Sequence, residues 1–598
     1  MLRSLFAPAA LAVSLALLSS LGLACGGADA PVAPPAPIIE PPVTPPVTPP
    51  VDEEEPPVVV PPVDPPPPVL TELEKPFVLP ALQTSVPDYA LELPEAELEK
   101  FYVDTQSPEV DATFIHAGVR YPVKLRLRGA SAREFPKKSW NVDFGEGSFD
   151  KRGSLNLVAE YSDASMMAEK IAYDLLAAMR APAPVAKFVN LTINGRYEGV
   201  FVDLEQVSKK FLKAHSFTDE DATIYRCGWK DCEFKPRSQK VGYQKEWNKK
   251  TNETSSDAPL DAVLEVINRT PEPQFAAALA RSLDVESFLR SMVMDTLAGN
   301  SWTEDSESYF IHDRAENKWV YVPWDLNNAD SRWWYPNPVG NKPPVTHPLY
   351  NFTAIDAVMN QRYAARKDLY AGYLPVFSNL ATRVIFNLEL RAKLEQRLDK
   401  ALAEIYTPEL LHSRIDAMHA LIDADMQRDP YMSDTARDQN GNLHHGYQKF
   451  VASRKFLKDF VTLRRGFIAT DRKRLSENAS PLVLWAVNPA EDWVEIRNVS
   501  ALPVSTFRDT SGGPVGMTLS ASLRQPFAMT LAALTLAPGE TIRVPLTMAE
   551  GGEVGLFDGA TFAGAQDLLF YGALPPGQIY ARSIAAPHRW EVRPSGTP

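Results

Sequence analysis

Alternating apolar and polar residues predict β-strands early in the folded part of the chain. In Val123–Arg128, apolar residues alternate with one lysine and two arginines, so one face of this strand is apolar and the other is basic. Residues Lys187–Asp203 alternate on both sides of Asn194-Gly195, a dipeptide that favours the positive φ angles of a type I′ turn. This second segment therefore predicts a β-hairpin.

Other segments repeat apolar residues every three or four positions, which is the period of an amphipathic helix. One follows Asp163, with an apolar residue at every fourth position of Met167–Met179. Another begins after Asp284, whose carboxylate is suited to cap a first helical turn. The region from Ser378 to Arg474 is mostly helical in pattern, interrupted by the polar loop Asp429–Gly446.

These patterns predict two folded domains. Strands and helices mix over residues 70–475, which predicts a large α+β domain. Residues 481–598 hold short apolar runs separated by Gly, Pro and Asn turns, the pattern of a small β-sandwich. A chain of 598 residues has room for both domains.

A proline-rich segment precedes the folded region. Of the 53 prolines, 18 fall within residues 31–69, where Pro-Pro-Val repeats. This composition favours extended polyproline II, which at roughly 3 Å per residue spans on the order of 100 Å. We therefore expect residues 26–69 to be a disordered, semi-rigid tether.

The first 25 residues have the features of an export signal. Arg3 precedes the mainly apolar stretch Leu5–Ala24, which ends at Cys25. The run Leu21-Gly-Leu-Ala-Cys resembles the lipobox of bacterial lipoproteins, whose cysteine is acylated, although Gly22 stands where a leucine is expected. A retained transmembrane anchor is the alternative, because about 20 apolar residues can span a bilayer. The lipobox predicts an exported lipoprotein of the cell envelope, at the outer membrane or cell surface.

The other two cysteines lie close together in the sequence. They enclose four residues in Cys227-Gly-Trp-Lys-Asp-Cys232. An even number of cysteines in an exported chain favours a disulfide between them, with free thiols as the alternative. The absence of a nearby histidine argues against a zinc site.

Composition and charge exclude several classes of protein. A hydrophobic content of 45% and a charged content of 23% are typical of globular proteins and exclude wholesale disorder. A net charge of −14 argues against nucleic acid as the main partner. The common motifs of P-loop nucleotide sites, zinc proteases, serine hydrolases and dinucleotide-binding proteins are absent from the sequence.

What remains is an ordered series of polar motifs in the large domain. In chain order they are Arg128-Gly-Ala-Ser131, Pro136-Lys-Lys-Ser-Trp140, Leu155-Asn-Leu157 with Asp163, Asn194-Gly-Arg-Tyr-Glu-Gly-Val-Phe201, Glu205, Ile224-Tyr-Arg226, Asn300, Ser308-Tyr-Phe310 and Pro323-Trp-Asp325. Their order and residue types resemble those of the spore-coat-protein-H-like (CotH) atypical kinases. The C-terminal domain resembles the lamin-tail type of immunoglobulin-like sandwich, through Asp492-Trp-Val-Glu-Ile-Arg-Asn498 and Leu536-Ala-Pro-Gly-Glu540.

The resemblance to CotH kinases implies transfer of a phosphoryl group from ATP to protein serine or threonine, with Mg²⁺ or Mn²⁺. Such transfer needs cations at the phosphates, carboxylates at the metal and a base that orients the acceptor. The residues expected at the nucleotide are Arg128, Lys137, Lys138 and Glu205. Lys138 is also expected to act in catalysis. Asp325, which follows the apolar strand Trp319–Val322, and Asn327 are expected to hold the metal.

The base is where this sequence departs from the family pattern. The family has an aspartate two residues after the asparagine that matches Asn300, and this chain has Trp302 there. Either an insertion shifts the loop and Asp305 is the base, as we expect, or the base is missing. A missing base would leave a catalytically degraded protein that assembles or scaffolds an envelope or coat.

The candidates also have purely structural interpretations. Lys137 and Lys138 can form a solvated edge. Glu205 can pair with Lys209 one helical turn on, and Asp325 can cap or pair locally. A third hypothesis, that the protein is a carbohydrate-active hydrolase or a metal hydrolase, is supported only by scattered acidic and aromatic residues. The expected partners are a protein substrate at the cell surface or envelope, and a membrane reached through the lipid anchor.

Overall fold

The computed structural model divides the chain into Met1–Val69 and Leu70–Pro598. It describes residues 73–129, 131–161, 163–227, 234–237, 247–299, 307–326, 345, 379–432, 446–477, 480–522, 527–559, 565–585 and 589–596. The expected export signal, its Cys25 and the proline-rich tether lie outside the described residues, so they stay predictions.

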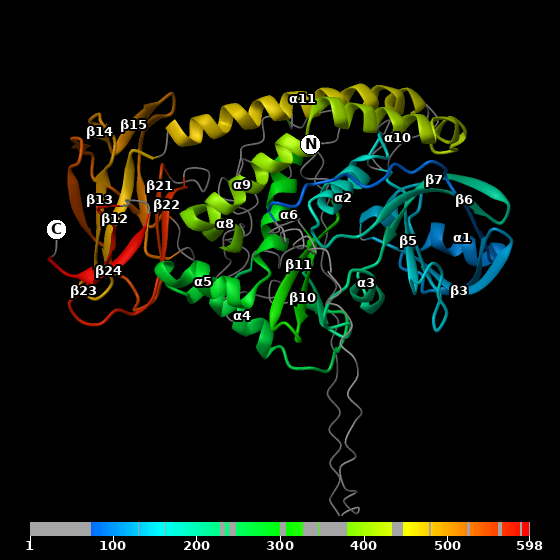
Figure 1. The fold of residues 1–598 in the computed structure, drawn as a ribbon, viewed down its shortest axis with the longest axis horizontal. Coiled ribbons are helices and arrows are strands. Elements are labelled where there is room, and N and C mark those ends of the chain that lie inside the picture. Colours follow the sequence, from blue (N-terminus) through cyan, green and yellow to red (C-terminus); the bar gives the residue numbers. More distant parts are fainter. Residues whose placement is uncertain are drawn as a thin grey trace, which may run out of the picture. The chain divides into compact units, whose positions relative to one another are not determined.

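A closed β-barrel forms the beginning of the described chain (Figure 1). In barrel order its strands are β1 (Asp88–Glu92), β2 (Val110–His116), β3 (Val119–Leu127), β4 (Trp140–Asp143), β5 (Ser154–Val158), β7 (Arg196–Glu205) and β6 (Ala186–Ile193). The helix α1 (Glu95–Val103) adds Leu98 and Phe101 to the core of the barrel. The sequence did not predict that this sheet closes.

Two predicted features of the barrel are confirmed. The apolar residues of β3 are buried in the barrel core, whereas Lys124 and Arg126 are exposed. The β6–β7 hairpin turns at Asn194 and Gly195, which have φ angles of 49° and 79°. Both angles are positive, as a type I′ turn requires.

A four-stranded sheet follows, with the strand order β11-β10-β8-β9. Its strands are β8 (Thr223–Cys227), β9 (Trp247–Lys249), β10 (Glu307–Asp313) and β11 (Lys318–Trp324). The helices that come before or between these strands are α2 (Ala168–Ala178), α3 (Lys209–Ala214), α4 (Ala258–Arg269), α5 (Glu272–Ser282) and α6 (Val285–Ala298). Helix α6 packs on β11, and Asp284 caps its start by accepting a hydrogen bond of 3.1 Å from the Glu286 N–H.

The next segment is helical, as the sequence predicts. It contains α8 (Asn379–Phe386), α9 (Leu388–Glu404), α10 (Pro408–Arg428) and α11 (Tyr447–Glu477), which are yellow-green to gold in Figure 1. These helices share one apolar core with α2, α6 and the four-stranded sheet. Within the described ranges, no helix combines the length and the apolar composition needed to cross a membrane.

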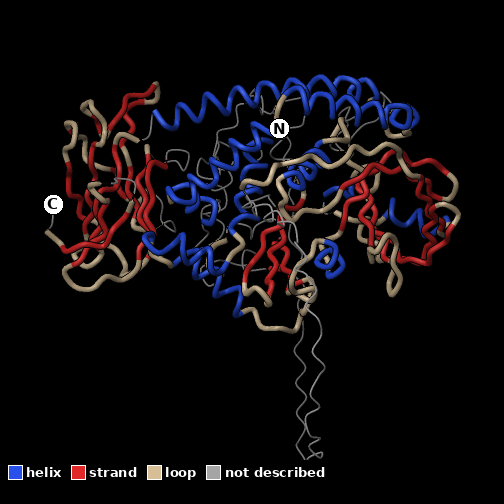
Figure 2. The backbone as a smooth tube through the Cα atoms, in the orientation of Figure 1, coloured by secondary structure: helices blue, strands red, loops and turns tan. Residues whose placement is uncertain are grey.

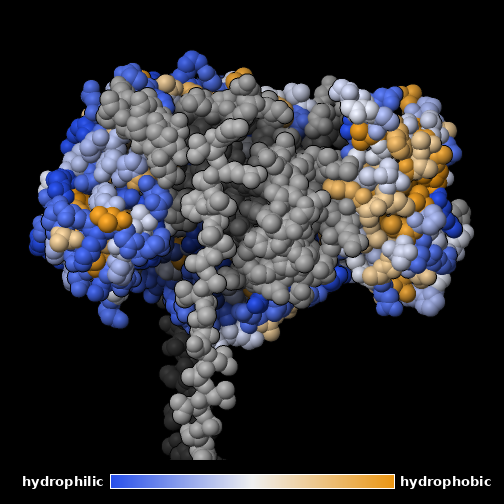
Figure 3. Space-filling view, turned by 180° about the vertical axis from the view of Figure 1, so that it is seen from behind, coloured by the Kyte–Doolittle hydropathy of each residue, from blue (hydrophilic) through white to orange (hydrophobic). Residues whose placement is uncertain are grey.

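The C-terminal region is all-β, as predicted (Figure 2). Its strands are β12 (Leu482–Asn488), β13 (Trp493–Asn498), β14 (Val504–Ser505), β15 (Phe507–Thr510), β16 (Gly513–Gly516), β17 (Thr518–Ser520), β18 (Met529–Thr530), β19 (Thr535–Leu536), β20 (Thr541–Pro545), β21 (Gly552–Phe557), β22 (Ala565–Tyr571), β23 (Gln578–Arg582) and β24 (Trp590–Pro594). A five-stranded sheet (β20-β13-β12-β23-β24) and a four-stranded sheet (β18-β17-β21-β22) contribute to one core. In Figure 3 apolar residues gather on the surface of this region, whereas the barrel is mostly hydrophilic on the same side.

The chain is therefore α+β with an all-β C-terminal region. The boundaries of the two expected domains, the kinase-like arrangement of the larger one and the lamin-tail type of the smaller one remain predictions.

Candidate functional site

Asp325 lies at the end of strand β11, as the sequence predicts. It is the first residue after the strand and has a φ angle of 58°. This left-handed conformation is uncommon for a residue other than glycine. The Asp325 side chain is partly buried, so its carboxyl is presented at a fixed point at the strand end.

Other carboxyl groups gather around Asp325. Burial, with the charges of Glu307 and Glu169, raises the pKa of Asp325 to about 7. Glu169 belongs to α2, and burial also raises the pKa of its carboxyl. A hydrogen bond with Glu160 and another with the backbone of Leu326 act in the opposite direction. Four acidic side chains from separate segments thus influence one another electrostatically.

Two arginines face these carboxyl groups. Arg128 follows β3 of the barrel, and its guanidinium carbon lies 5.8 Å from the ring centroid of Trp324. Arg226 of β8 forms an ion pair with Glu307. Both guanidinium charges lower the pKa of Asp325, against the effect of burial. The structure therefore places Arg128 beside Trp324, the residue before Asp325.

The acidic members of this cluster other than Asp325 were missed in the sequence. Glu169 lies in the helix predicted after Asp163, but the apolar repeat shows only which residues face the core. In the structure almost every residue of α2 is buried, including Glu169 with 2% of its surface exposed. A signal was present, because α2 is rich in apolar residues yet also carries Glu169, Lys170 and Asp174, and charged residues that are buried need a partner or a purpose. Arg226 was noted only as part of a motif.

Lys137 is tied into a buried ion pair. Its ammonium donates hydrogen bonds of 2.7 Å to Asp429 Oδ2 and 2.6 Å to the Val200 carbonyl. The two charged side chains are 1% and 0% exposed. A Cβ atom at Gly199, whose φ is +104°, would lie 2.0 Å from Asp429 Oδ2. This contact joins β7 to the end of α10, and the role of Lys137 at a phosphate stays a prediction.

Lys138 is also buried, so the interpretation of both lysines as a solvated edge is wrong. Lys138 is 6% exposed, and its ammonium donates a hydrogen bond of 2.5 Å to the Arg133 carbonyl. Burial lowers its pKa. In the part of the chain that the structure describes, no hydrogen bond or ion pair joins Lys138 to Asp325. Its catalytic role stays a prediction.

Glu205 ends strand β7 and has local partners. It accepts a hydrogen bond of 3.1 Å from the Val185 N–H, and its Oε2 lies 2.9 Å from His215 Nε2. Lys209 forms an ion pair with Asp221 instead, so the proposed pairing of Glu205 with Lys209 is wrong. The role of Glu205 at the nucleotide stays a prediction.

The remaining sequence candidates are not all covered by the structure. Asp305, Asn327 and Cys232 lie outside the described residues. Cys227 ends β8, with its Sγ 2.8 Å from Ser308 Oγ. The disulfide, the base and the second metal ligand therefore stay predictions.

The residues at Asp325 fit a divalent cation by their chemistry. No group of three or more His, Cys, Asp or Glu side chains arranged to hold a metal ion occurs among the residues described. However, one buried oxygen of Glu169, Oε2, has no hydrogen-bond partner among the residues that the structure describes. Carboxylate oxygens are the ligands that Mg²⁺ and Mn²⁺ prefer, so Asp325 and Glu169 are the candidates.

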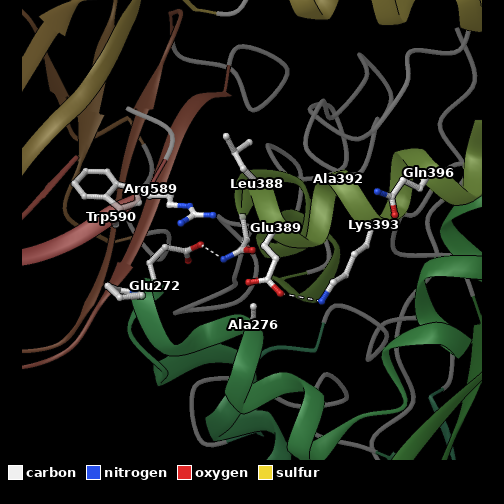
Figure 4. A pocket seen from close by; sticks show the side chains of 11 residues that line it. Glu272, Ala276, Leu388, Glu389, Ala392, Lys393, Gln396, Arg589 and Trp590 are labelled. Atoms are coloured by element: carbon white, nitrogen blue, oxygen red, sulfur yellow. Dashed lines mark hydrogen bonds and ion pairs between the residues drawn. The ribbon is translucent and has the colours of Figure 1, made fainter. Parts of the chain in front are cut away.

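A separate cavity of about 630 Å³ lies between α5, α9 and the start of β24 (Figure 4). Two of its acidic groups have polar partners within the lining. Glu272 accepts a hydrogen bond of 2.8 Å from Asn387, and Glu389 accepts one of 2.8 Å from Lys393. None of the residues lining this cavity belongs to the cluster around Asp325.

Comparison with known proteins identifies the region that contains the Asp325 cluster. A family model described as "CotH kinase protein" matches residues 125–468, more than half of the chain. The inner spore coat protein H of Bacillus subtilis (strain 168) is 25% identical over 362 residues, which cover 58% of this chain and 90% of that protein. The match runs from β3 to α11 and includes every residue of the Asp325 cluster. The chain therefore belongs to the CotH kinase protein family.

Proposed function

We propose that this protein is an extracytoplasmic, membrane-tethered protein kinase that transfers the γ-phosphate of ATP to serine or threonine of a protein. The observation that carries the proposal is the cluster of Arg128, Glu169 and Asp325, which lies inside the CotH-matched region. It combines acidic side chains suited to a metal with cations suited to phosphates. A raised carboxyl pKa beside specific charged partners is also typical of functional sites.

Each group of the cluster has a task in such a transfer. A bound Mg²⁺ or Mn²⁺ would neutralise charge on the phosphate oxygens. Asp325 and Glu169 would hold this cation, and Asn327 is expected to add a neutral oxygen. Arg128 faces the same carboxylates and would balance the charge of the phosphates. These groups act by positioning and by electrostatics, which is what phosphoryl transfer requires of a protein.

The acceptor hydroxyl needs a base during the reaction. Its oxygen forms a bond to the γ-phosphorus while the bond between that phosphorus and the bridging oxygen breaks, and ADP leaves. The hydroxyl proton moves to the base, for which the sequence offers Asp305.

The location of the protein is part of the proposal. Cys25 would carry the lipid, and residues 26–69 would hold the kinase domain away from the membrane. The matched relative is by its name a spore coat protein, which is consistent with a coat or envelope location. A disulfide between Cys227 and Cys232 would suit an exported protein.

A non-catalytic scaffold is the second candidate. The observation that favours it is Trp302, which stands where the family pattern has an aspartate. A protein without a base would retain the fold and assemble an envelope or coat without transferring phosphate.

Transfer of labelled phosphate from ATP to protein, with Mg²⁺ or Mn²⁺, tests the proposal. The full chain is compared with Asp325→Ala and with Asp111→Asn, which removes an exposed carboxylate of the barrel. We expect Asp325→Ala to lose about a hundredfold or more of the activity, and Asp111→Asn to keep it. Equal incorporation of labelled phosphate by wild type and Asp325→Ala would show that Asp325 does not belong to the active site. Folded wild-type protein that transfers no phosphate would favour the scaffold.

A further inference from the structure

Two cationic side chains, from Arg226 and Lys250, share one face of the four-stranded sheet whose strand β11 ends just before Asp325. Directly opposed residues of antiparallel strands point to the same face. Arg226 of β8 is opposite Tyr309 of β10 and Asn248 of β9. Lys250 lies two residues beyond Asn248, and its N–H donates a hydrogen bond of 2.8 Å to the Ile224 carbonyl, which continues the ladder. Lys250 and Arg226 therefore lie on the same face.

The neighbouring lysine, Lys249, lies on the other face of the sheet. There it forms an ion pair of 2.8 Å with Asp257 and lies 5.3 Å from the ring centroid of Tyr225. Lys250 has no ion pair with any described residue. One lysine is thus neutralised by an internal partner, and the next is presented on the face that carries Arg226.

Arg226 has an N–H group that does not bond to its partner Glu307. Its NH2 group donates to Glu307, but its Nε is buried and has no hydrogen-bond partner in the described part of the chain. Glu307, to which Arg226 donates, is paired on β11 with Trp324, the residue before Asp325. An anion bound at Arg226 would accept a hydrogen bond from its Nε–H and would lie beside the acidic cluster.

The barrel adds positive charge through Arg128, whose guanidinium carbon lies 5.8 Å from the ring centroid of Trp324, the residue before Asp325. The charges of Arg226 and Arg126, after the effect of burial, lower the pKa of Lys250. The charges of Arg133 and Arg128 likewise lower the pKa of Arg126, after burial. Carboxylates also act here, since Glu253 and Glu307 raise the pKa of Lys250. Cations held near one another are destabilising until an anion binds between them.

We propose that Arg226 and Lys250, with Arg126 and Arg128 at the end of β3, bind the phosphate chain of a nucleoside triphosphate whose terminal phosphate lies at Asp325. A linear polyphosphate carries several negative charges and matches cations contributed by two sheets. Arginine forks and a lysine ammonium are the groups that proteins use for such contacts. Lys137 was expected to contact the phosphates, but its ammonium is already paired with Asp429. In this proposal the four residues named above contact the phosphates instead.

The identity of the ligand rests on the proposed function, whereas the site itself can be tested without activity. Isothermal titration calorimetry measures binding of ATP with Mn²⁺, and of inorganic tripolyphosphate without metal, to the full chain. The variants are Lys250→Gln, Arg126→Gln and the double variant. Both residues are exposed, so the variants are expected to fold. We expect about tenfold weaker binding of both ligands for each cation removed.

The matched control is Lys124→Gln. Lys124 lies two residues before Arg126 on the same face of β3, but it pairs with Asp111 at 2.8 Å. We expect this variant to bind both ligands as the wild type does.

The outcomes separate this inference from the proposed function. Unchanged binding of ATP and tripolyphosphate by the double variant would overturn the inference and leave the proposed function standing. Wild-type protein that binds tripolyphosphate but not ATP, with loss of binding in the double variant, would support the anion site and count against the kinase. Wild-type protein that binds neither ligand would overturn the inference.

Discussion

The carboxyl group of Asp325 is held where its negative charge is disfavoured. Burial, Glu307 and Glu169 together outweigh Arg128 and Arg226, so its pKa is raised to about 7. Such a group reduces the stability of the folded state unless a ligand compensates for it. Residues that cost stability in this way are expected at functional sites.

Replacing Asp325 with asparagine should therefore stabilise the protein without metal. An unfolded aspartate loses its proton near pH 4. The folded carboxyl keeps its proton up to about pH 7, so wild-type stability falls between these values as the pH rises. In urea unfolding with EDTA, we expect Asp325→Asn to gain about 1–3 kcal/mol at pH 8 and almost nothing at pH 4. A loss of stability at pH 8 would contradict this account.

Sequence reasoning found the site residues that end strongly patterned strands. Arg128 and Asp325 were recognised through motifs shared with the CotH kinases, and Asp325 also because it follows a strand whose apolar pattern is clear. Glu169 was missed because helical periodicity does not show how tightly α2 is enclosed on its other faces. The environment of Lys137 could not be predicted either, since its partner Asp429 is 292 residues away in the chain.

At the scale of elements, the ion pair of Lys137 and Asp429 connects the barrel to the helical region. Asp429 follows α10, and it accepts hydrogen bonds from the Lys137 ammonium and from the Val200 N–H of β7. The approach is close enough that only a glycine fits at position 199. Removal of one partner would leave the other charge buried without compensation.

Lys137→Met should consequently destabilise the fold. We expect a loss of about 3–5 kcal/mol in the free energy of unfolding, because Asp429 stays buried. Adding Asp429→Asn should restore part of this loss, since the uncompensated charge is then absent. Chemical denaturation followed by circular dichroism measures both effects. A single variant as stable as the wild type would show that this contact contributes nothing.

Local elements were more predictable than their assembly. The β6–β7 hairpin, the start of α6 at Asp284 and the helices α8 to α11 follow from turn chemistry, capping and periodicity. Closure of the barrel depends on β1 pairing with β6, whose residues are about a hundred positions apart. No local pattern encodes such a pairing.

At the scale of the whole molecule, Arg383 of α8 joins the helices to the C-terminal β region. Its guanidinium carbon lies 3.6 Å from the ring centroid of Phe275 in α5 and 4.3 Å from that of Phe570 in β22. It also forms an ion pair of 3.0 Å with Glu272. The family match ends at residue 468, so this contact attaches a region that lies beyond it.

Phe570→Ala should weaken this attachment. Loss of the ring removes buried apolar contact and the interaction with Arg383, for which we expect about 3–5 kcal/mol of destabilisation. The β region should then unfold at a lower temperature than the rest in differential scanning calorimetry. Val592→Ala, at a residue of β24 that is 38% exposed, serves as the control. An unchanged profile for Phe570→Ala would contradict the proposed connection.

The central claim is that Asp325 holds a divalent cation together with ATP. Titration of Mn²⁺ in the presence of ATP, followed by the electron paramagnetic resonance signal of free Mn²⁺, measures this directly in wild type and Asp325→Asn. The account predicts that wild-type protein takes up the ion and that Asp325→Asn binds it about tenfold or more weakly. Equal uptake by both proteins, or none by the wild type, would contradict it.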